Sequence, residues 1–234
     1  MEQIRLDKYL ADSGIGSRSQ VKQYIKKRQV SVNGAFITSG DIKIHPQTDV
    51  VQFQGQTIAR EPYVYYMLNK PAGSVSATID NTCPTVLSFI HDTTHSDLFP
   101  VGRLDKDTEG LLLITNDGDL AHRLLSPKKH VDKTYYVEVD SAIPETAIST
   151  FALGMDIGEE QNTLPASLEL LSSNRAYLTI QEGKFHQVKR MFHGVGCEVT
   201  YLKRIRMGSL ELDTSLSPGD YRPLTREELA ALSK

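Results

Sequence analysis

The segment from Phe99 to Gly118 constrains this chain more than any other part of its sequence. Arg103 and Asp105 stand at alternate positions directly after a glycine, and an apolar run, Leu111 to Ile114, follows them. Alternate positions in extended chain point to the same side, so the two side chains are expected to face one site. A carboxylate beside a guanidinium stays ionised at neutral pH. The pattern therefore favours an anionic nucleophile or base over a proton donor.

The same segment resembles the catalytic motif of pseudouridine synthases, in the branch that modifies ribosomal RNA. The resemblance is carried by Gly-Arg-Leu-Asp at 102–105 and by Asp-Thr-Glu-Gly-Leu-Leu at 107–112. It implies that Asp105 is the catalytic carboxylate, which either attacks the base or sugar or removes a ribose proton. It also implies that Arg103 contacts RNA and stabilises a uridine that has left its base stack, a step that such enzymes need.

Three further residues match the active site of this family. Tyr135 matches the tyrosine whose ring can stack on the flipped uracil. Lys184, in the basic stretch 182–191, matches the residue that pairs with the catalytic aspartate, and Leu202 matches an apolar residue under the tyrosine ring. The implied reaction breaks the uridine glycosidic bond and rejoins the uracil through carbon without redox change, so neither a metal nor a cofactor is expected.

Residues 1–58 are expected to form a separate small domain. Ser17 is suited to cap a helix over about 18–28, whose apolar residues recur at three- and four-residue spacing. This helix and the residues directly after it carry a row of cations without an acidic neighbour: Arg18, Lys22, Lys26, Lys27 and Arg28. Solvated helix faces usually mix charges, because like charges four residues apart repel. The row therefore indicates a phosphate partner.

The first 55 residues resemble the S-four-like RNA-binding domain of ribosomal proteins. The matching stretches are Arg5 to Leu10, Ser17 to Ser19, and Val30 to Gly34, which ends on an Asn-Gly turn. The resemblance implies that the basic helix lies against structured RNA. Gly55 to Pro62 is expected to be a linker, and residues 63–234 to form the catalytic domain. The predicted fold is α+β, with a small S-four-like domain followed by a mixed, largely antiparallel pseudouridine synthase domain.

The net charge of −3 conceals two basic regions. Residues 1–60 hold nine Lys/Arg against five Asp/Glu, and residues 184–206 hold six against one. Such a surface is compatible with RNA binding at a defined face, and Lys189 and Arg190 are expected to be free to meet phosphate. Two Cys in 234 residues favour a reducing compartment. No apolar run approaches the roughly 18 residues of a membrane span. We therefore expect a cytoplasmic monomer whose partner is ribosomal RNA, free or in a partly assembled particle.

The N-terminal domain, taken with the stretch 184–191, resembles the members of this family that act on the small subunit, which implies one uridine in small-subunit ribosomal RNA as the target. The same reaction on large-subunit RNA is the alternative within the family. A non-catalytic RNA-binding factor for ribosome assembly would keep the basic helix, but would have no reason to keep Asp105, Tyr135 and Lys184 together. A hydrolase that uses Asp105 and Asp107 as a carboxylate pair is disfavoured, because the chain has no Trp with which to build a sugar-binding cleft.

Overall fold

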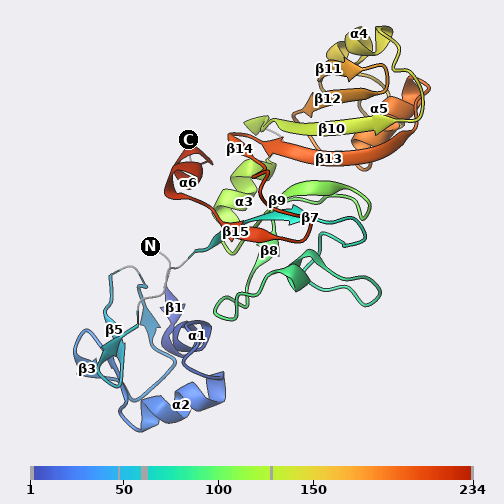
Figure 1. Ribbon diagram of the computed structural model, residues 1–234. Coiled ribbons are helices and arrows are strands. Elements are labelled where there is room, and N and C mark those ends of the chain that lie inside the picture. The colour runs from blue at the N-terminus through green and yellow to red at the C-terminus, as the bar shows by residue number, and fades with distance from the viewer. Residues whose placement is uncertain (1–2, 47, 59–62, 127–128, 233–234) are drawn as a thin grey trace. The chain divides into compact units, whose positions relative to one another are not determined.

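The structure is a computed structural model that describes residues 3–46, 48–58, 63–126 and 129–232. The chain divides into two compact units (Figure 1): Met1–Val64 with His91–Asp97, and Tyr65–Ile90 with Leu98–Lys234. The expected linker from Gly55 to Pro62 lies in part outside the described residues, since 59–62 are not described.

The first unit combines two helices with short strands. Its elements are, in chain order, β1 (Ile4–Arg5), α1 (Leu6–Asp12), α2 (Arg18–Lys26), β2 (Val30–Val32), β3 (Ala35–Phe36), β4 (Lys43–Ile44), β5 (Val51–Phe53) and β6 (Gln56–Thr57). β1 pairs with β4, and the other strands form an antiparallel sheet in the order β3-β2-β5-β6. Leu10, Val21 and Ile25 bury the apolar sides of the two helices in a core shared with β2 and β5.

Helix α2 begins where the sequence predicts and ends two residues earlier. The Ser17 hydroxyl accepts a hydrogen bond from the Gln20 amide at 3.3 Å, and the Gln20 side chain accepts one from the Ser17 amide at 2.8 Å. This capping box satisfies two amides that the helix itself leaves free. The helix does not reach Arg28, because that residue adopts a left-handed φ of +55°. The expected Asn33-Gly34 turn joins β2 to β3, with φ of +50° and +82°.

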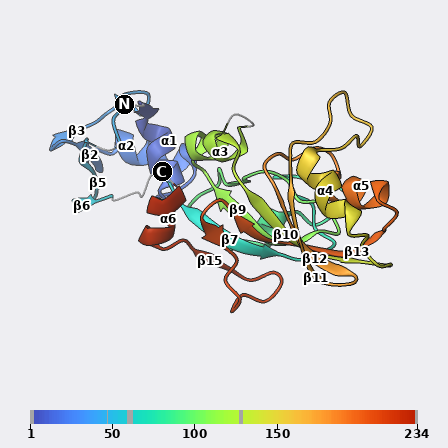
Figure 2. The same cartoon turned by 90° about the horizontal axis from the view of Figure 1, so that it is seen from above.

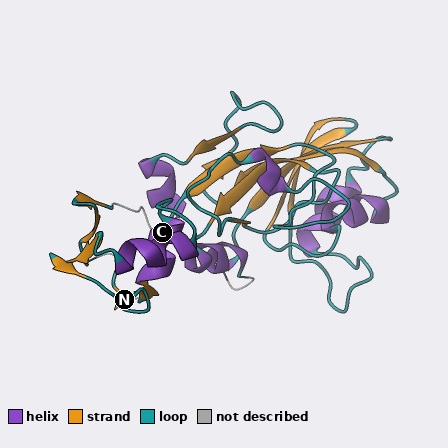
Figure 3. Cartoon of the chain, turned by 90° about the horizontal axis from the view of Figure 1, so that it is seen from below, coloured by secondary structure: helices purple, strands orange, loops and turns teal. Residues whose placement is uncertain are grey.

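The second unit is built on one large sheet. Its strands are β7 (Tyr65–Lys70), β8 (Phe99–Pro100), β9 (Glu109–Thr115), β10 (Lys133–Val139), β11 (Ser167–Ser172), β12 (Arg175–Ile180), β13 (Val199–Met207), β14 (Leu210–Glu211) and β15 (Tyr221–Pro223). They follow the order β11-β12-β10-β13-β9-β7-β15, with β14 on β13 and β8 on β9. Among these described pairs β13 and β9 run parallel and the others antiparallel, which confirms the predicted α+β fold. Figure 3 shows the strands as one twisted band flanked by helices.

Two groups of helices pack against this sheet, beside a short 3-10 helix, η1 (Val86–Phe89). α4 (Thr146–Leu153) lies beside β11 and α5 (Gln187–Gly194) beside β13 (Figures 1 and 2), and the rings of Phe151 and Phe192 meet edge to face at 5.4 Å. α3 (Gly118–Leu125) and α6 (Arg226–Leu232) share a second core with β7 and β9. Asp117 caps α3, since its carboxylate accepts a hydrogen bond from the Leu120 amide at 3.0 Å. None of the helices described has the length and apolar character needed to cross a bilayer.

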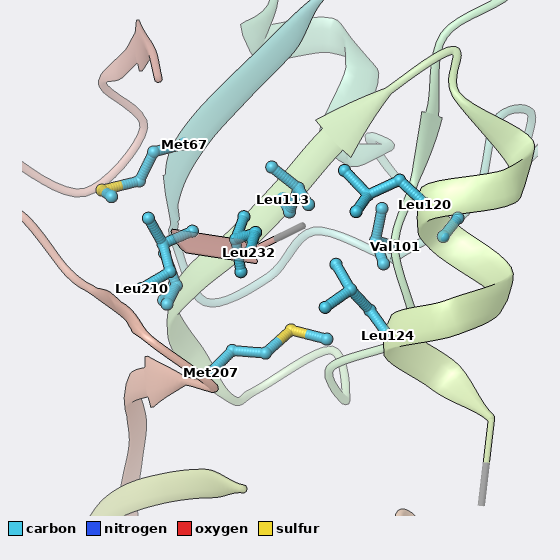
Figure 4. Close-up of a cluster of buried hydrophobic side chains, with 10 residues drawn as sticks. Met67, Val101, Leu113, Leu120, Leu124, Met207, Leu210 and Leu232 are labelled. Carbon is cyan, nitrogen blue, oxygen red and sulfur yellow. The ribbon is translucent and has the colours of Figure 1, made fainter. Parts of the chain in front are cut away.

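The core beneath α3 explains the apolar run that follows the Asp105 motif. Leu113 on β9 lies in one cluster with Leu120 and Leu124 of α3 (Figure 4). Leu112 and Ile114, which point to the opposite face of β9, are also fully buried. A strand covered on both faces reads as a continuous apolar run rather than an alternating one. β9 is therefore a firmly packed base for the loop that precedes it.

Candidate active site

Asp105 lies in the irregular loop that leads from β8 into β9, rather than in extended strand. The Ser76 hydroxyl accepts a hydrogen bond from the Leu104 amide at 3.0 Å and donates one to the Leu104 carbonyl at 2.9 Å. These two bonds hold the loop directly before Asp105. Although the segment is not a strand, Arg103 and Asp105 do line one cavity, as their spacing predicts.

Lys70 is a fully buried cation beneath the same loop. Its ammonium group donates to three main-chain carbonyls, those of Thr108 at 2.8 Å, Pro71 at 3.1 Å and Lys106 at 3.3 Å. Burial lowers the pKa of Lys70 from 10.5 to about 8, although the charges of Asp107 and Asp105 oppose this effect. Lys70 thus ties the end of β7 to the loop on the C-terminal side of Asp105.

The start of β9 leaves no room for a side chain. Gly110 has a φ of +100°, and a Cβ atom there would stand 2.2 Å from the Arg204 carbonyl oxygen of β13. Only glycine tolerates both this conformation and this contact. The glycine of the Asp-Thr-Glu-Gly stretch therefore allows β9 to approach β13 directly after the Asp105 loop.

A cavity of about 70 Å³ beside Asp105, here called the catalytic cavity, brings the predicted active-site residues together. Its lining includes all five: Arg103, Asp105, Tyr135, Lys184 and Leu202. Tyr135 stands on β10, where it pairs with Arg204, and Leu202 stands two residues before Arg204 on β13. Cross-strand partners and residues two apart share a face of the sheet, so Tyr135 and Leu202 face the same side. Four separate segments of the chain thus converge on one site.

The cation that meets Asp105 is Lys189. Its Nζ atom lies 3.1 Å from Asp105 Oδ2 and 2.6 Å from Asp107 Oδ1. The ammonium group of Lys184 instead donates to the main-chain carbonyls of residues 161–162. The expectation that Lys184 pairs with Asp105 is therefore wrong in this structure, and so is the expectation that Lys189 is free to meet phosphate.

Helix geometry explains this exchange of roles. Lys184 precedes α5, and its amide donates to the Gln187 side chain at 2.9 Å within the turn that opens the helix. Lys189 stands in the first turn of α5, next to the buried Val188 and two positions before the buried Met191. Successive helix residues are about 100° apart, so Lys189 lies to one side of this buried face and reaches the Asp105 loop.

Both carboxylates of the loop influence Lys189. Burial disfavours its charge, but hydrogen bonds to Asp107 and Asp105 outweigh burial and raise the pKa of Lys189 above its ordinary value. Burial likewise works against ionised Asp107, and the bond from Lys189 overcomes it and lowers the pKa of Asp107. Lys189 is therefore a firmly protonated cation between two carboxylates.

Two basic residues next to this cluster lie in positions that the sequence did not predict. His186 lies with its Nε2 atom 3.7 Å from Asp105 Oδ1, a position that the sequence did not reveal. Arg190, expected to be free for phosphate, bonds to the Glu159 carboxylate at 2.6 Å and to the Phe185 carbonyl at 3.1 Å. The expectation that Arg190 is free to meet phosphate is also wrong, because its guanidinium is paired with the Glu159 carboxylate.

The cations predicted on the first unit have a different environment. All of them are exposed, and none makes an ion pair with any residue that the structure describes: Arg18, Lys22, Lys26, Lys27 and Arg28. Their contact with RNA stays a prediction.

The catalytic cavity can hold an anionic carboxylate against a planar aromatic ring. The Asp105 side chain is 28% exposed, with the Lys189 ammonium beside it, and Tyr135 is almost fully buried in the wall. Such a pocket suits a flat, uncharged ring that reacts with a carboxylate. Across the described ranges no group of three His, Cys, Asp or Glu side chains is placed to hold a metal ion.

Comparisons with known proteins show the family to which this chain belongs. The pattern of the family described as RNA pseudouridylate synthase matches residues 64–194, and that of the S4 domain matches residues 4–50. The uncharacterized RNA pseudouridine synthase YtzG of Bacillus subtilis is 48% identical over 238 residues and covers 99% of each chain. Ribosomal small subunit pseudouridine synthase A of Escherichia coli K12 is 42% identical over 231 residues, which is 98% of this chain and 100% of that one.

A solved structure supports the same assignment. The crystal structure of a pseudouridylate synthase superimposes with a TM-score of 0.71 at 40% identity, covering 98% of this chain and 99% of that one. The chain therefore belongs to the RNA pseudouridylate synthase family. The expected isomerase with an N-terminal S4 domain is confirmed.

Proposed function

We propose that this protein converts one uridine of small-subunit ribosomal RNA to pseudouridine, with Asp105 as the catalytic carboxylate. The observation that carries the proposal is the contact of Asp105 with Lys189 at 3.1 Å in a cavity walled by Tyr135. The relatives named as small-subunit synthases, alike over nearly the whole chain, favour this substrate over large-subunit RNA.

Each side chain of the catalytic cavity has a different role in the proposed reaction. The uridine N-glycosidic bond breaks, the uracil turns, and the ring rejoins the ribose through carbon, so that no atom is gained or lost. Asp105 attacks the base or sugar or removes a ribose proton, and each route needs its anionic form, which the Lys189 ammonium stabilises. Tyr135 stacks on the uracil above Leu202, and Arg103 stabilises the RNA from which the uridine has been flipped.

The first unit supplies RNA affinity through the exposed row on α2. Exposed cations without a protein partner are available to phosphate, which is the sequence-independent part of RNA binding. We propose that the protein acts as a monomer. With ribosomal RNA as substrate, free or in a partly assembled particle, the protein acts in ribosome biogenesis in the cytoplasm.

The test maps pseudouridine in ribosomal RNA treated with the wild type or with Asp105→Asn. The substitution removes the charge but keeps the shape, so we expect turnover to fall at least about 1,000-fold with RNA affinity unchanged. Asp107→Asn is the matched control, because Asp107 shares Lys189 but is 72% exposed, and it should keep activity within about tenfold. Modification of large-subunit RNA alone would contradict the substrate, and an active Asp105→Asn would contradict the catalytic assignment.

A further inference from the structure

A larger cavity of about 360 Å³ overlaps the catalytic cavity and extends beyond it. The linings of the two cavities have six residues in common: Arg103, Asp105, Tyr135, Gly183, Lys184 and His186. They differ along β13, since Leu202 lines only the catalytic cavity and Arg204, two residues further on, lines only the larger one. Side chains two apart on a strand are about 7 Å apart on one face. The two cavities therefore lie next to each other along β13.

The floor of the larger cavity holds two buried cations, Arg204 and Lys133. Arg204 is 2% exposed, and its Nε atom donates to the Leu111 carbonyl at 2.8 Å, whereas its Nη2 atom has no partner among the described residues. Lys133 is 8% exposed and donates to the Val131 carbonyl at 2.8 Å. Burial and then the charge of Arg204 lower the pKa of Lys133, and the charges of Asp132 and Glu182 oppose them. A buried donor without an acceptor is costly, so the Arg204 Nη2 atom calls for an acceptor from a ligand.

The two acidic side chains near this floor bond elsewhere. The Asp132 carboxylate accepts a hydrogen bond from the Gln181 side chain at 3.0 Å. The Glu182 carboxylate accepts one from the Leu164 amide at 2.7 Å and one from the Gln187 side chain at 3.0 Å. Neither carboxylate is bonded to the Arg204 Nη2 atom, which is left for an acceptor such as a phosphate oxygen.

One wall of the larger cavity is an exposed aromatic stack. Phe185 is 65% exposed, and its ring stacks on the His186 imidazole with centroids 3.8 Å apart and planes inclined by 20°. His186 in turn lies 3.7 Å from Asp105. The stack thus begins at the catalytic carboxylate and ends on an exposed ring. Any nucleobase can extend such a stack, because every base has a flat π face.

We propose that the larger cavity binds the nucleotide next to the target uridine, with its base on Phe185 and its phosphate against Lys133 and Arg204. The inference rests on the proposed function and adds a second nucleotide subsite to it. In this arrangement the base stacks on the exposed Phe185 ring, and a phosphate oxygen accepts a hydrogen bond from the Arg204 Nη2 atom, which has no partner among the described residues. Anchoring this neighbour fixes which uridine reaches Asp105.

The first test combines variants of Phe185 with gaps in the RNA. A short RNA that the wild type converts is remade with an abasic nucleotide on the 5′ or the 3′ side of the target uridine. At one of these sides we expect kcat/KM of the wild type to fall about tenfold, the size of one base-stacking contact. On intact RNA, kcat/KM of Phe185→Leu should be about tenfold below that of the wild type. Changing from intact to abasic RNA should then lower kcat/KM of Phe185→Leu by less than about twofold more. Phe185→Tyr should behave as the wild type.

The control for an exposed apolar side chain is Leu153→Ala, because Leu153 is 83% exposed on α4 and lines neither cavity. It should keep both the activity and the abasic penalty of the wild type. The stacking contact would be overturned if, at the side where an abasic nucleotide lowers kcat/KM of the wild type, it lowered kcat/KM of Phe185→Leu by the same factor.

The second test removes one charge from the RNA backbone. A neutral methylphosphonate linkage on the same side of the uridine should lower kcat/KM of the wild type about tenfold. It should lower kcat/KM of Lys133→Gln little below the value on unmodified RNA, whereas Lys133→Arg should show the same tenfold fall as the wild type. Lys203→Gln is the control, since Lys203 precedes Arg204 and points to the opposite face of β13. Equal penalties in the wild type and in Lys133→Gln would overturn the phosphate contact.

The two proposals can fail separately. A wild type that converts the unmodified RNA but ignores both kinds of altered neighbour contradicts the subsite alone. A wild type without turnover on unmodified RNA contradicts the proposed function, and the same cycles measured as binding affinity then decide the subsite.

Discussion

The two units of this enzyme use positive charge in different ways. On α2 of the first unit, Arg18, Lys22 and Lys26 are exposed, and none of them meets an acidic partner among the described residues. In the second unit, Lys189 stands between two carboxylates and Lys70 lies buried beneath three carbonyls. The first arrangement leaves charge available to a ligand such as the phosphate that we propose, and the second uses charge to hold the Asp105 loop.

The difference shows that a count of basic residues cannot separate affinity from chemistry. Exposed charges are screened by salt within about 10 Å at 0.1 M ionic strength, so their contribution falls as salt rises. A partly buried ammonium on a carboxylate is screened much less and is protected by its geometry. Substitutions in the two units should therefore affect different measurements.

Among substitutions of the cations in the two units, the largest effect is expected from Lys189→Met. The variant leaves Asp105 and Asp107 without their shared ammonium, so kcat should fall at least about 100-fold while RNA affinity stays within about twofold. Lys184→Met should reduce kcat less than about tenfold, because the Lys184 ammonium meets only carbonyls. Single-turnover rates at saturating enzyme measure both. A greater reduction in Lys184→Met would restore the pairing expected from the sequence.

Replacement of Tyr135 should have the next largest effect. Tyr135→Leu removes the stacking surface and should cost about 10- to 100-fold in kcat/KM. Tyr135→Phe should stay within about threefold, since the hydroxyl makes no hydrogen bond within the described part of the chain. Steady-state kinetics on the same RNA compare the two. Equal reductions would assign the function of Tyr135 to its hydroxyl.

Lys70→Met should change stability in a pH-dependent way. The native pKa of about 8 lies below the 10.5 of the unfolded chain, so between these values the unfolded state binds more protons. The free energy of unfolding of the wild type should therefore rise relative to Lys70→Met from pH 8 to 10.5, by about 3 kcal/mol. Urea unfolding of both proteins at pH 7.5 and 10.5 measures the difference. A difference that stays constant or falls would contradict a buried ammonium with a lowered pKa.

Local signals in the sequence were sufficient for much of the fold. The Ser17 cap and the Asn33-Gly34 turn depend on local backbone and side-chain preferences, and each is found as predicted. The family motifs in the sequence predicted that Asp105 and Tyr135 belong to one site, and both residues line the same cavity.

Tertiary packing decided what the sequence could not show. Whether Lys184 or Lys189 meets Asp105 depends on how α5 is rotated against the sheet, which distant residues determine. Arg204 counted as one more charge of a basic region, yet it is almost fully buried against the carbonyl of Leu111 on β9. Charge patterns reveal which residues are cationic but not which of them folding removes from solvent.

The most direct measurement compares Lys189→Met with a variant in which Arg18, Lys22 and Lys26 are all changed to Gln. RNA binding is followed across a salt series, and single-turnover rates are taken at saturating enzyme. The triple variant should keep its saturated rate within about twofold, while the slope of log affinity against log salt falls by about two to three units, because each cation removed leaves one phosphate unbound. Lys189→Met should do the reverse, with an unchanged slope and a collapsed rate. A triple variant with an unchanged slope and a collapsed saturated rate would contradict the division of positive charge between the two units.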